Sequence, residues 1–156
     1  PLEAGSVLRL PKEKDDTDLQ ACVKEGLARG FRHFLLVGCT GGRLDHFLSV
    51  LSVLAFLEKE GARGMILAEG NRIFWAEGPF AAVIPNDPAF PYFSLQPMDE
   101  KVLGVTIRGA KYPLMNHTLY RAASLGISNE VSAEAAAVSA RKGALLIILS
   151  NDKKGG

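Results

Sequence analysis

The chain is poor in cysteine, in net charge and in long apolar runs, and each shortage excludes a class of protein. Cys22 and Cys39 are the only cysteines among 156 residues, too few for the disulfide framework of a small secreted domain. The net charge of +1 gives no global attraction to nucleic acid or to a membrane surface. No apolar run approaches the roughly 18 residues of a membrane-spanning helix. We therefore expect a cytoplasmic protein that binds no nucleic acid and no membrane.

The first 70 residues alternate between strand-like and helix-like segments. The apolar patterns predict strands at 6–10, 31–38 and 64–70, the second of them buried, and helices at 16–30 and 43–60. Such alternation is typical of a parallel α/β layer with right-handed crossovers. In the second helix the side chains expected to face inward are those of Leu44, Phe47, Leu48, Leu51, Leu54 and Ala55.

After residue 70 the pattern changes to short apolar runs such as "RIFWA", "FAAVIP" and "ALLIILS". Turn residues recur about every 8 to 12 positions, which is typical of an antiparallel sandwich or barrel. The stretch "SAEAAAVSA" is rich in alanine, which favours helix, but we interpret it as a strand. The predicted fold class is α/β plus all-β, with a truncated parallel, Rossmann-like α/β layer in residues 1–70 and an antiparallel β-sandwich in residues 71–156.

Polar motifs follow the first two predicted strands, "KEKDDTD" after the first and "GCTGGRLDH" after the second. Because ligands of α/β layers bind beyond the carboxyl ends of the strands, we expect both motifs at one site. Thr40, Gly41 and Gly42 form a loop whose backbone and following helix start can approach a phosphate. Arg43 can hold a phosphate through two parallel hydrogen bonds, and the nearby carboxylates suit Mg²⁺. The residues therefore indicate phosphoryl-type transfer.

Simpler interpretations of these motifs remain open. The glycine loop lacks the G-x-x-x-x-G-K-[ST] pattern, and a glycine-rich turn between a strand and a helix is more often structural than functional. Thr17 and Gln20 have the spacing of a capping box, so part of the acidic cluster is explained by a helix start. Cys39 is a candidate reactive thiol without a base beside it, and Cys22 lies on the apolar face expected in the core.

Four motifs occur in order along the chain: "DDTD", "GGRLDH", "KYPL" and "GISNE". Together they resemble the motifs of bacterial thiamine pyrophosphokinases (thiamine diphosphokinases), and the resemblance extends from about Leu8 to Ser150. It implies transfer of a pyrophosphoryl group from ATP to the hydroxyl of thiamine, with Mg²⁺ required, to give thiamine diphosphate and AMP. It also implies an α/β domain followed by a β-sandwich, assembled as a homodimer with active sites between subunits.

The resemblance also implies roles for particular residues. Asp15 and Asp18 match acidic positions tied to Mg²⁺, and Lys14 precedes them, where its charge can neutralise the transferring phosphate. Arg43 and Asp45 match an R-x-D element at the catalytic centre. The expected catalytic set is thus Arg43, Asp45, Asp18 and Lys14, and the expected nucleotide-binding set is Thr40, Gly41, Gly42 and Arg43. Whether Asp18 or Asp45 accepts the hydroxyl proton stays open.

The thiamine pocket is implied by residues of the second half. Ser128 and Asn129 match a Ser-Asn pair that lines it, and Tyr112 occupies a position where some relatives have a tryptophan that stacks on the cationic thiamine.

The chain departs from the family pattern in one respect. The family has a further acidic motif, G-D-x-D-S, upstream of its D-x-T-D element, and this sequence does not contain it. We expect that motif, with the first strands of the α/β layer, in a longer protein, and an inactive remnant is the other interpretation. Two further alternatives are a pyrophosphokinase acting on another alcohol and a non-catalytic module for thiamine binding or dimerisation.

Overall fold

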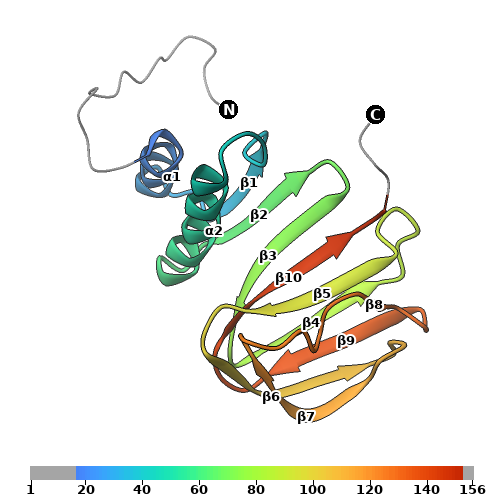
Figure 1. Ribbon diagram of the computed structural model, residues 1–156. Coiled ribbons are helices and arrows are strands. Elements are labelled where there is room, and N and C mark those ends of the chain that lie inside the picture. Colours follow the sequence, from blue (N-terminus) through green and yellow to red (C-terminus); the bar gives the residue numbers. More distant parts are fainter. Residues whose placement is uncertain (1–16, 153–156) are drawn as a thin grey trace.

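The computed structural model describes residues 17–152, which form helices and two β-sheets (Figure 1). The predicted strand at 6–10 lies outside the described residues. The elements of the α/β part are α1 (Asp18–Ala28), β1 (His33–Val37), α2 (Leu44–Lys59) and β2 (Arg63–Ala68). Those that follow are β3 (Asn71–Glu77), β4 (Phe80–Pro85), β5 (Tyr92–Pro97), β6 (Lys101–Arg108), β7 (Leu114–Tyr120), β8 (Asn129–Glu130), β9 (Ala135–Ala140) and β10 (Ala144–Ser150).

The larger sheet runs through both parts of the molecule in the order β1-β2-β3-β10-β5-β8. Strands β1 and β2 are parallel, with His33 opposite Arg63, and α2 connects them as a crossover helix. Strand β3 then pairs antiparallel with β2, from Met65 opposite Phe74 to Ala68 opposite Asn71. The predicted combination of an α/β layer and an antiparallel sandwich is confirmed, and the two share one continuous sheet. The domain boundary at residue 70 stays a prediction.

The smaller sheet, in the order β4-β9-β6-β7, covers the sandwich side of the larger sheet (Figure 1). Phe93 and Leu95 of the larger sheet share a buried core with Val105, Leu119 and Val138 of the smaller one. The alanine-rich stretch is strand β9, as predicted, and its burial alternates along the chain. Alternation with a period of two lets one face of β9 pack into the core, and this packing outweighs the helix propensity of alanine.

Helix α2 packs on the other face of the larger sheet. Leu54 and Leu57 are almost fully buried, in a second core that includes Ile66 and Ile73. A Cβ placed on Gly64 of β2 would lie 2.7 Å from Leu57 Cδ1 and 2.8 Å from Leu54 Cδ2. The absence of a side chain at Gly64 thus allows α2 to lie directly against the backbone of β2, and this contact positions the helix.

The expected burial of β1 and of the first turns of α2 is wrong. Strand β1 is largely exposed, with Leu35 at 55% and Val37 at 64%, and only Leu36 is buried within it. Leu44 and Leu48, expected to face inward, are 78% and 62% exposed. Strand β1 is the outer strand of its sheet, and none of the described elements covers these side chains. The helix is instead anchored by its later turns.

Helix α1 begins after Thr17, whose hydroxyl oxygen accepts a hydrogen bond from the Gln20 N–H at 3.2 Å. The capping role of Thr17 is therefore confirmed. Cys22 is exposed rather than in the core, because α1 packs inward through Val23. Among the described residues no helix is both long and apolar enough to cross a membrane.

Candidate functional site

The expected metal ligands lie at the start of the described chain. Lys14 and Asp15 are outside the described residues. Asp18 is the first residue of α1 and is exposed, in the first turn where the helix dipole favours a carboxylate. Within residues 17–152 no three His, Cys, Asp or Glu side chains form a group that could hold a metal ion. The assignment of Asp15 and Asp18 to Mg²⁺ therefore stays a prediction.

Arg43 and Asp45 form an ion pair at the start of α2. Arg43 Nε donates to Asp45 Oδ1 at 3.1 Å, and Arg43 Nη2 donates to Asp45 Oδ2. The backbone N–H of His46 also donates to Asp45 Oδ1, at 2.9 Å. Hydrogen bonding to Arg43 holds the pKa of the Asp45 carboxyl below its ordinary value. The side chain of Arg43 is 74% exposed, so an anion can reach its guanidinium while Asp45 orients it.

The loop before this pair is open to solvent. Gly42 has a φ of +78°, a left-handed conformation that glycine adopts without steric cost. A Cβ placed on Gly41 or on Gly42 would meet no atom within 4 Å. The loop therefore leaves space above its backbone beside the first N–H groups of α2, as a phosphate site requires. Thr40, which precedes the glycines, is half-buried.

Cys39 lies in the same loop but packs against the core beneath α2. Burial raises the pKa of its thiol, whereas a reactive cysteine needs a lowered pKa. The interpretation of Cys39 as a nucleophile is therefore disfavoured, and it is better described as a packing residue.

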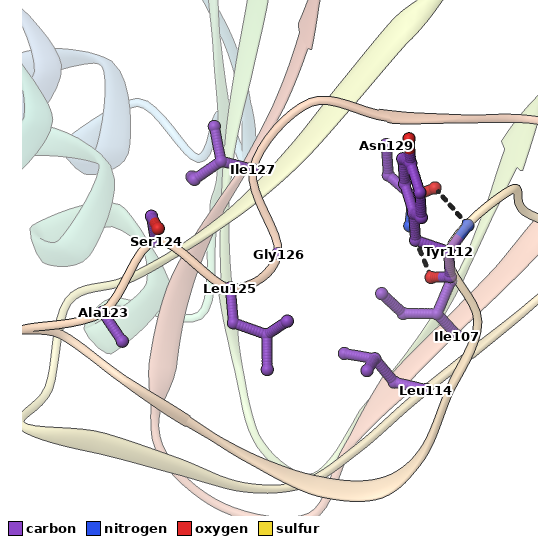
Figure 2. Close-up of a pocket in the computed structure, with 9 residues that line it drawn as sticks. All are labelled: Ile107, Tyr112, Leu114, Ala123, Ser124, Leu125, Gly126, Ile127 and Asn129. Carbon is purple, nitrogen blue, oxygen red and sulfur yellow. Dashed lines mark hydrogen bonds between the residues drawn. The ribbon is translucent and has the colours of Figure 1, made fainter.

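Tyr112 and Asn129 line a cavity of about 510 Å³ in the sandwich (Figure 2). Its other walls are mostly apolar and come from β6, β7 and the segment before β8: Ile107, Leu114, Ala123, Ser124, Leu125, Gly126 and Ile127. Ser128 adjoins this wall, is exposed and does not line the cavity. The apolar walls with few polar groups match a site for a small organic ligand.

The Asn129 side chain holds the backbone of Tyr112 through two hydrogen bonds. Asn129 is 2% exposed, and its Oδ1 accepts hydrogen bonds from the N–H of Tyr112 at 3.0 Å and of Glu130 at 2.9 Å. Its Nδ2 donates to the carbonyl oxygen of Tyr112 at 2.8 Å, and Figure 2 shows both bonds to Tyr112. Asn129 thus satisfies both backbone polar groups of Tyr112, as a neighbouring strand would.

Two charged residues beside the cavity were not predicted from the sequence. The Lys111 ammonium lies 5.6 Å from the centroid of the Tyr112 ring and forms an ion pair with Glu130. The hydrogen bond to Glu130 raises the pKa of Lys111. Their only sequence signal is adjacency, because Lys111 precedes Tyr112 and Glu130 follows Asn129.

The structure therefore brings the predicted residues together in two pairs. Arg43 and Asp45 meet at the start of α2, and Tyr112, in the segment between β6 and β7, meets Asn129 of β8. Figure 1 shows that α2 and β8 lie in different parts of the molecule. Fold and site together define an α/β-plus-sandwich protein with an exposed glycine loop beside an Arg–Asp pair and a separate, mostly apolar cavity.

Comparisons with known proteins identify the family. Residues 3–66 match "Thiamin pyrophosphokinase, catalytic domain", and residues 82–145 match "Thiamin pyrophosphokinase, vitamin B1 binding domain". The thiamine pyrophosphokinase of Bacillus subtilis (strain 168) is 33% identical over 141 residues, which are 90% of this chain and 65% of that protein. This chain belongs to the thiamin pyrophosphokinase family.

Solved structures agree with this assignment. The thiamine pyrophosphokinase structure from Bacillus subtilis has a TM-score of 0.86 and 32% identity, covering 90% of this chain and 66% of that one. A thiamin pyrophosphokinase family protein from Enterococcus faecalis has a TM-score of 0.83 and 31% identity, covering 95% of this chain and 70% of that one. The chain thus spans about two thirds of the length of these relatives.

Proposed function

We propose that this protein is a cytoplasmic thiamine diphosphokinase that transfers pyrophosphate from ATP to the hydroxyl of thiamine, releasing AMP. The observation that carries the proposal is the match to a catalytic domain and then to a vitamin B1 binding domain, in that order on one chain. The exposed Arg43–Asp45 pair and the cavity beside Tyr112 give each half a site of suitable chemistry.

The reaction requires positioning and charge neutralisation more than covalent chemistry by the protein. The thiamine oxygen forms a bond to the β-phosphorus of ATP, the bond from that phosphorus to the α–β bridging oxygen breaks, and AMP leaves with the bridging oxygen. Arg43 stabilises negative charge on the phosphate oxygens, with Lys14 as a second cation. Asp15 and the exposed Asp18 would hold Mg²⁺, since carboxylate oxygens are its preferred protein ligands. Bound Mg²⁺ would supply further neutralisation of the phosphates.

The hydroxyl proton passes to a carboxylate, and Asp18 and Asp45 are the two candidates for this role. Both carboxylate oxygens of Asp45 accept hydrogen bonds from Arg43, which lowers the pKa of Asp45 and weakens it as a base. Asp45 then acts mainly by orienting the Arg43 guanidinium.

A homodimer with shared active sites is part of the proposal. The two pairs of predicted residues lie on elements in different parts of one chain, α2 and β8 (Figure 1). A second copy can bring the cavity of one subunit to the loop of the other. Exposed apolar side chains on both parts, among them Leu48 of α2 and Met115 of β7, offer surface for such a contact.

The role of the Arg43–Asp45 pair is tested by kinetics of the full-length protein. We expect Arg43→Ala to lower kcat by about a hundredfold or more, because it removes a preorganised positive charge. Arg108→Ala, a matched loss of an exposed arginine at the end of β6, should leave the rate unchanged. Near-normal AMP release by Arg43→Ala would remove Arg43 from the catalytic centre. A panel of other alcohols with ATP separates the proposed activity from a related pyrophosphokinase.

A further inference from the structure

The segment that forms one wall of the cavity is held by consecutive residues of β5. Phe93 is the strand partner of Asn129, and the hydroxyl oxygen of Ser94 accepts a hydrogen bond from the Ser128 N–H at 3.0 Å. The N–H of Leu95 donates to the carbonyl oxygen of Gly126 at 2.8 Å. Of these contacts, only the one from Ser94 is made by a side chain, so it alone depends on residue type.

The held segment has an unusual backbone. Ser128 has a φ of +56°, a left-handed conformation that residues other than glycine keep only where their surroundings fix it. Gly126 has a φ of +100°, and a Cβ there would lie 3.0 Å from the carbonyl oxygen of Leu95. The segment therefore lies close against the backbone of β5, with little room for a side chain at residue 126.

The Ser94 side chain is buried, so its hydroxyl is not explained as a solvent-exposed polar group. Ser94 and Asn129 are the buried polar residues of the described chain, at 9% and 2% exposure. The Ser94 hydroxyl accepts a hydrogen bond from the Ser128 N–H. Asn129, which follows Ser128, is hydrogen-bonded to the backbone N–H and carbonyl oxygen of Tyr112. A continuous series of bonds therefore links Ser94 through Ser128 and Asn129 to the backbone of Tyr112, although Ser94 itself does not line the cavity.

We propose that Ser94 is a positioning residue for thiamine. The Ser94 hydroxyl fixes the Ser128–Asn129 backbone and thereby the distance between the cavity wall and Tyr112. The proposal rests on the proposed function of the cavity. Loss of the hydroxyl leaves the Ser128 N–H without its acceptor, which relaxes the left-handed turn and displaces Asn129. Binding of thiamine should weaken, while binding of ATP at the Arg43 loop should not.

The test compares three substitutions at Ser94 in the full-length protein. Ser94→Ala should raise the KM for thiamine about tenfold, the equivalent of one buried hydrogen bond, with the KM for ATP and kcat within about twofold. Ser94→Thr keeps a hydroxyl and should restore the thiamine KM. Ser94→Cys keeps the size with a poor acceptor and should behave like alanine. Ser139→Ala, the same change on β9, is the control and should alter neither KM.

The outcomes separate this inference from the proposed function. A wild-type protein that neither binds thiamine in calorimetry nor turns it over overturns both. An active wild type with a normal thiamine KM in Ser94→Ala overturns the inference alone, even if the melting temperature falls, because Ser94 then only stabilises the fold. A normal thiamine KM in Ser94→Cys, or an equal rise in the KM for ATP, is also incompatible with a positioning role.

Discussion

At the scale of single residues, sequence spacing predicts some contacts and is silent on others. Arg43 and Asp45 are two positions apart at a helix start, so their contact follows from local geometry, and the structure shows it. The hydrogen bonds between the Asn129 side chain and the Tyr112 backbone join residues 17 positions apart. The family resemblance implies that Asn129 lines the thiamine pocket, but it does not indicate whether the amide faces the pocket or the backbone.

The titration of Asp45 tests the ion pair directly. Because Arg43 lowers the pKa of Asp45 in the folded protein, the pair contributes stability above the ordinary aspartate pKa and loses it as the pH falls through the lowered value. Both side chains are mostly exposed, so solvent screens this contribution. We expect Arg43→Ala to move the pKa of Asp45 up towards its ordinary value in a carboxyl NMR titration, with Arg108→Ala as control. An unchanged Asp45 titration in Arg43→Ala would contradict the pairing.

At the scale of elements, periodicity predicts which segments form helices and strands better than it predicts which face is buried. The predicted helix at 43–60 and strand at 64–70 are present as α2 and β2. Leu44 and Leu48 fit an apolar stripe but are exposed, since the sheet contacts later turns of the helix. Burial of a stripe depends on which element lies opposite, and that is not a local property of the sequence.

The contact between α2 and β2 gives a stability prediction. Gly64→Ala places a methyl group against Leu54 and Leu57, which are buried and have little room to move, so we expect a loss of about 1–3 kcal/mol in unfolding free energy. Gly41→Ala adds the same methyl group in open space and should change stability by no more than about 1 kcal/mol. Urea denaturation measures both. Equal stability of the two variants would show that α2 does not depend on close contact with β2.

At the scale of the whole molecule, the order of fold types was predictable and the sheet that joins them was not. The change from mixed to purely strand-like patterns predicts a transition near residue 70. The larger sheet forms because β10, at the end of the described chain, inserts between β3 and β5. The residue pattern of a strand does not identify the strand with which it pairs, so this long-range pairing cannot be predicted from local sequence.

The proposed sharing of active sites between subunits predicts complementation. Arg43→Ala and Tyr112→Ala alter different halves of the site, so a refolded equal mixture should regain about a quarter of wild-type activity, because half of the dimers are mixed and each has one intact site. Each variant alone should stay nearly inactive under the same assay. Failure of the mixture to regain activity would place both halves of a working site within one subunit.

Transfer of pyrophosphate to thiamine can be tested by identifying the products of a single reaction. The full-length protein is incubated with ATP, Mg²⁺ and thiamine, and the products are followed by ³¹P NMR. We expect AMP and thiamine diphosphate to appear in equal amounts, and neither to form when thiamine is omitted. Thiamine binding without AMP release, or release of ADP in place of AMP, would contradict this expectation.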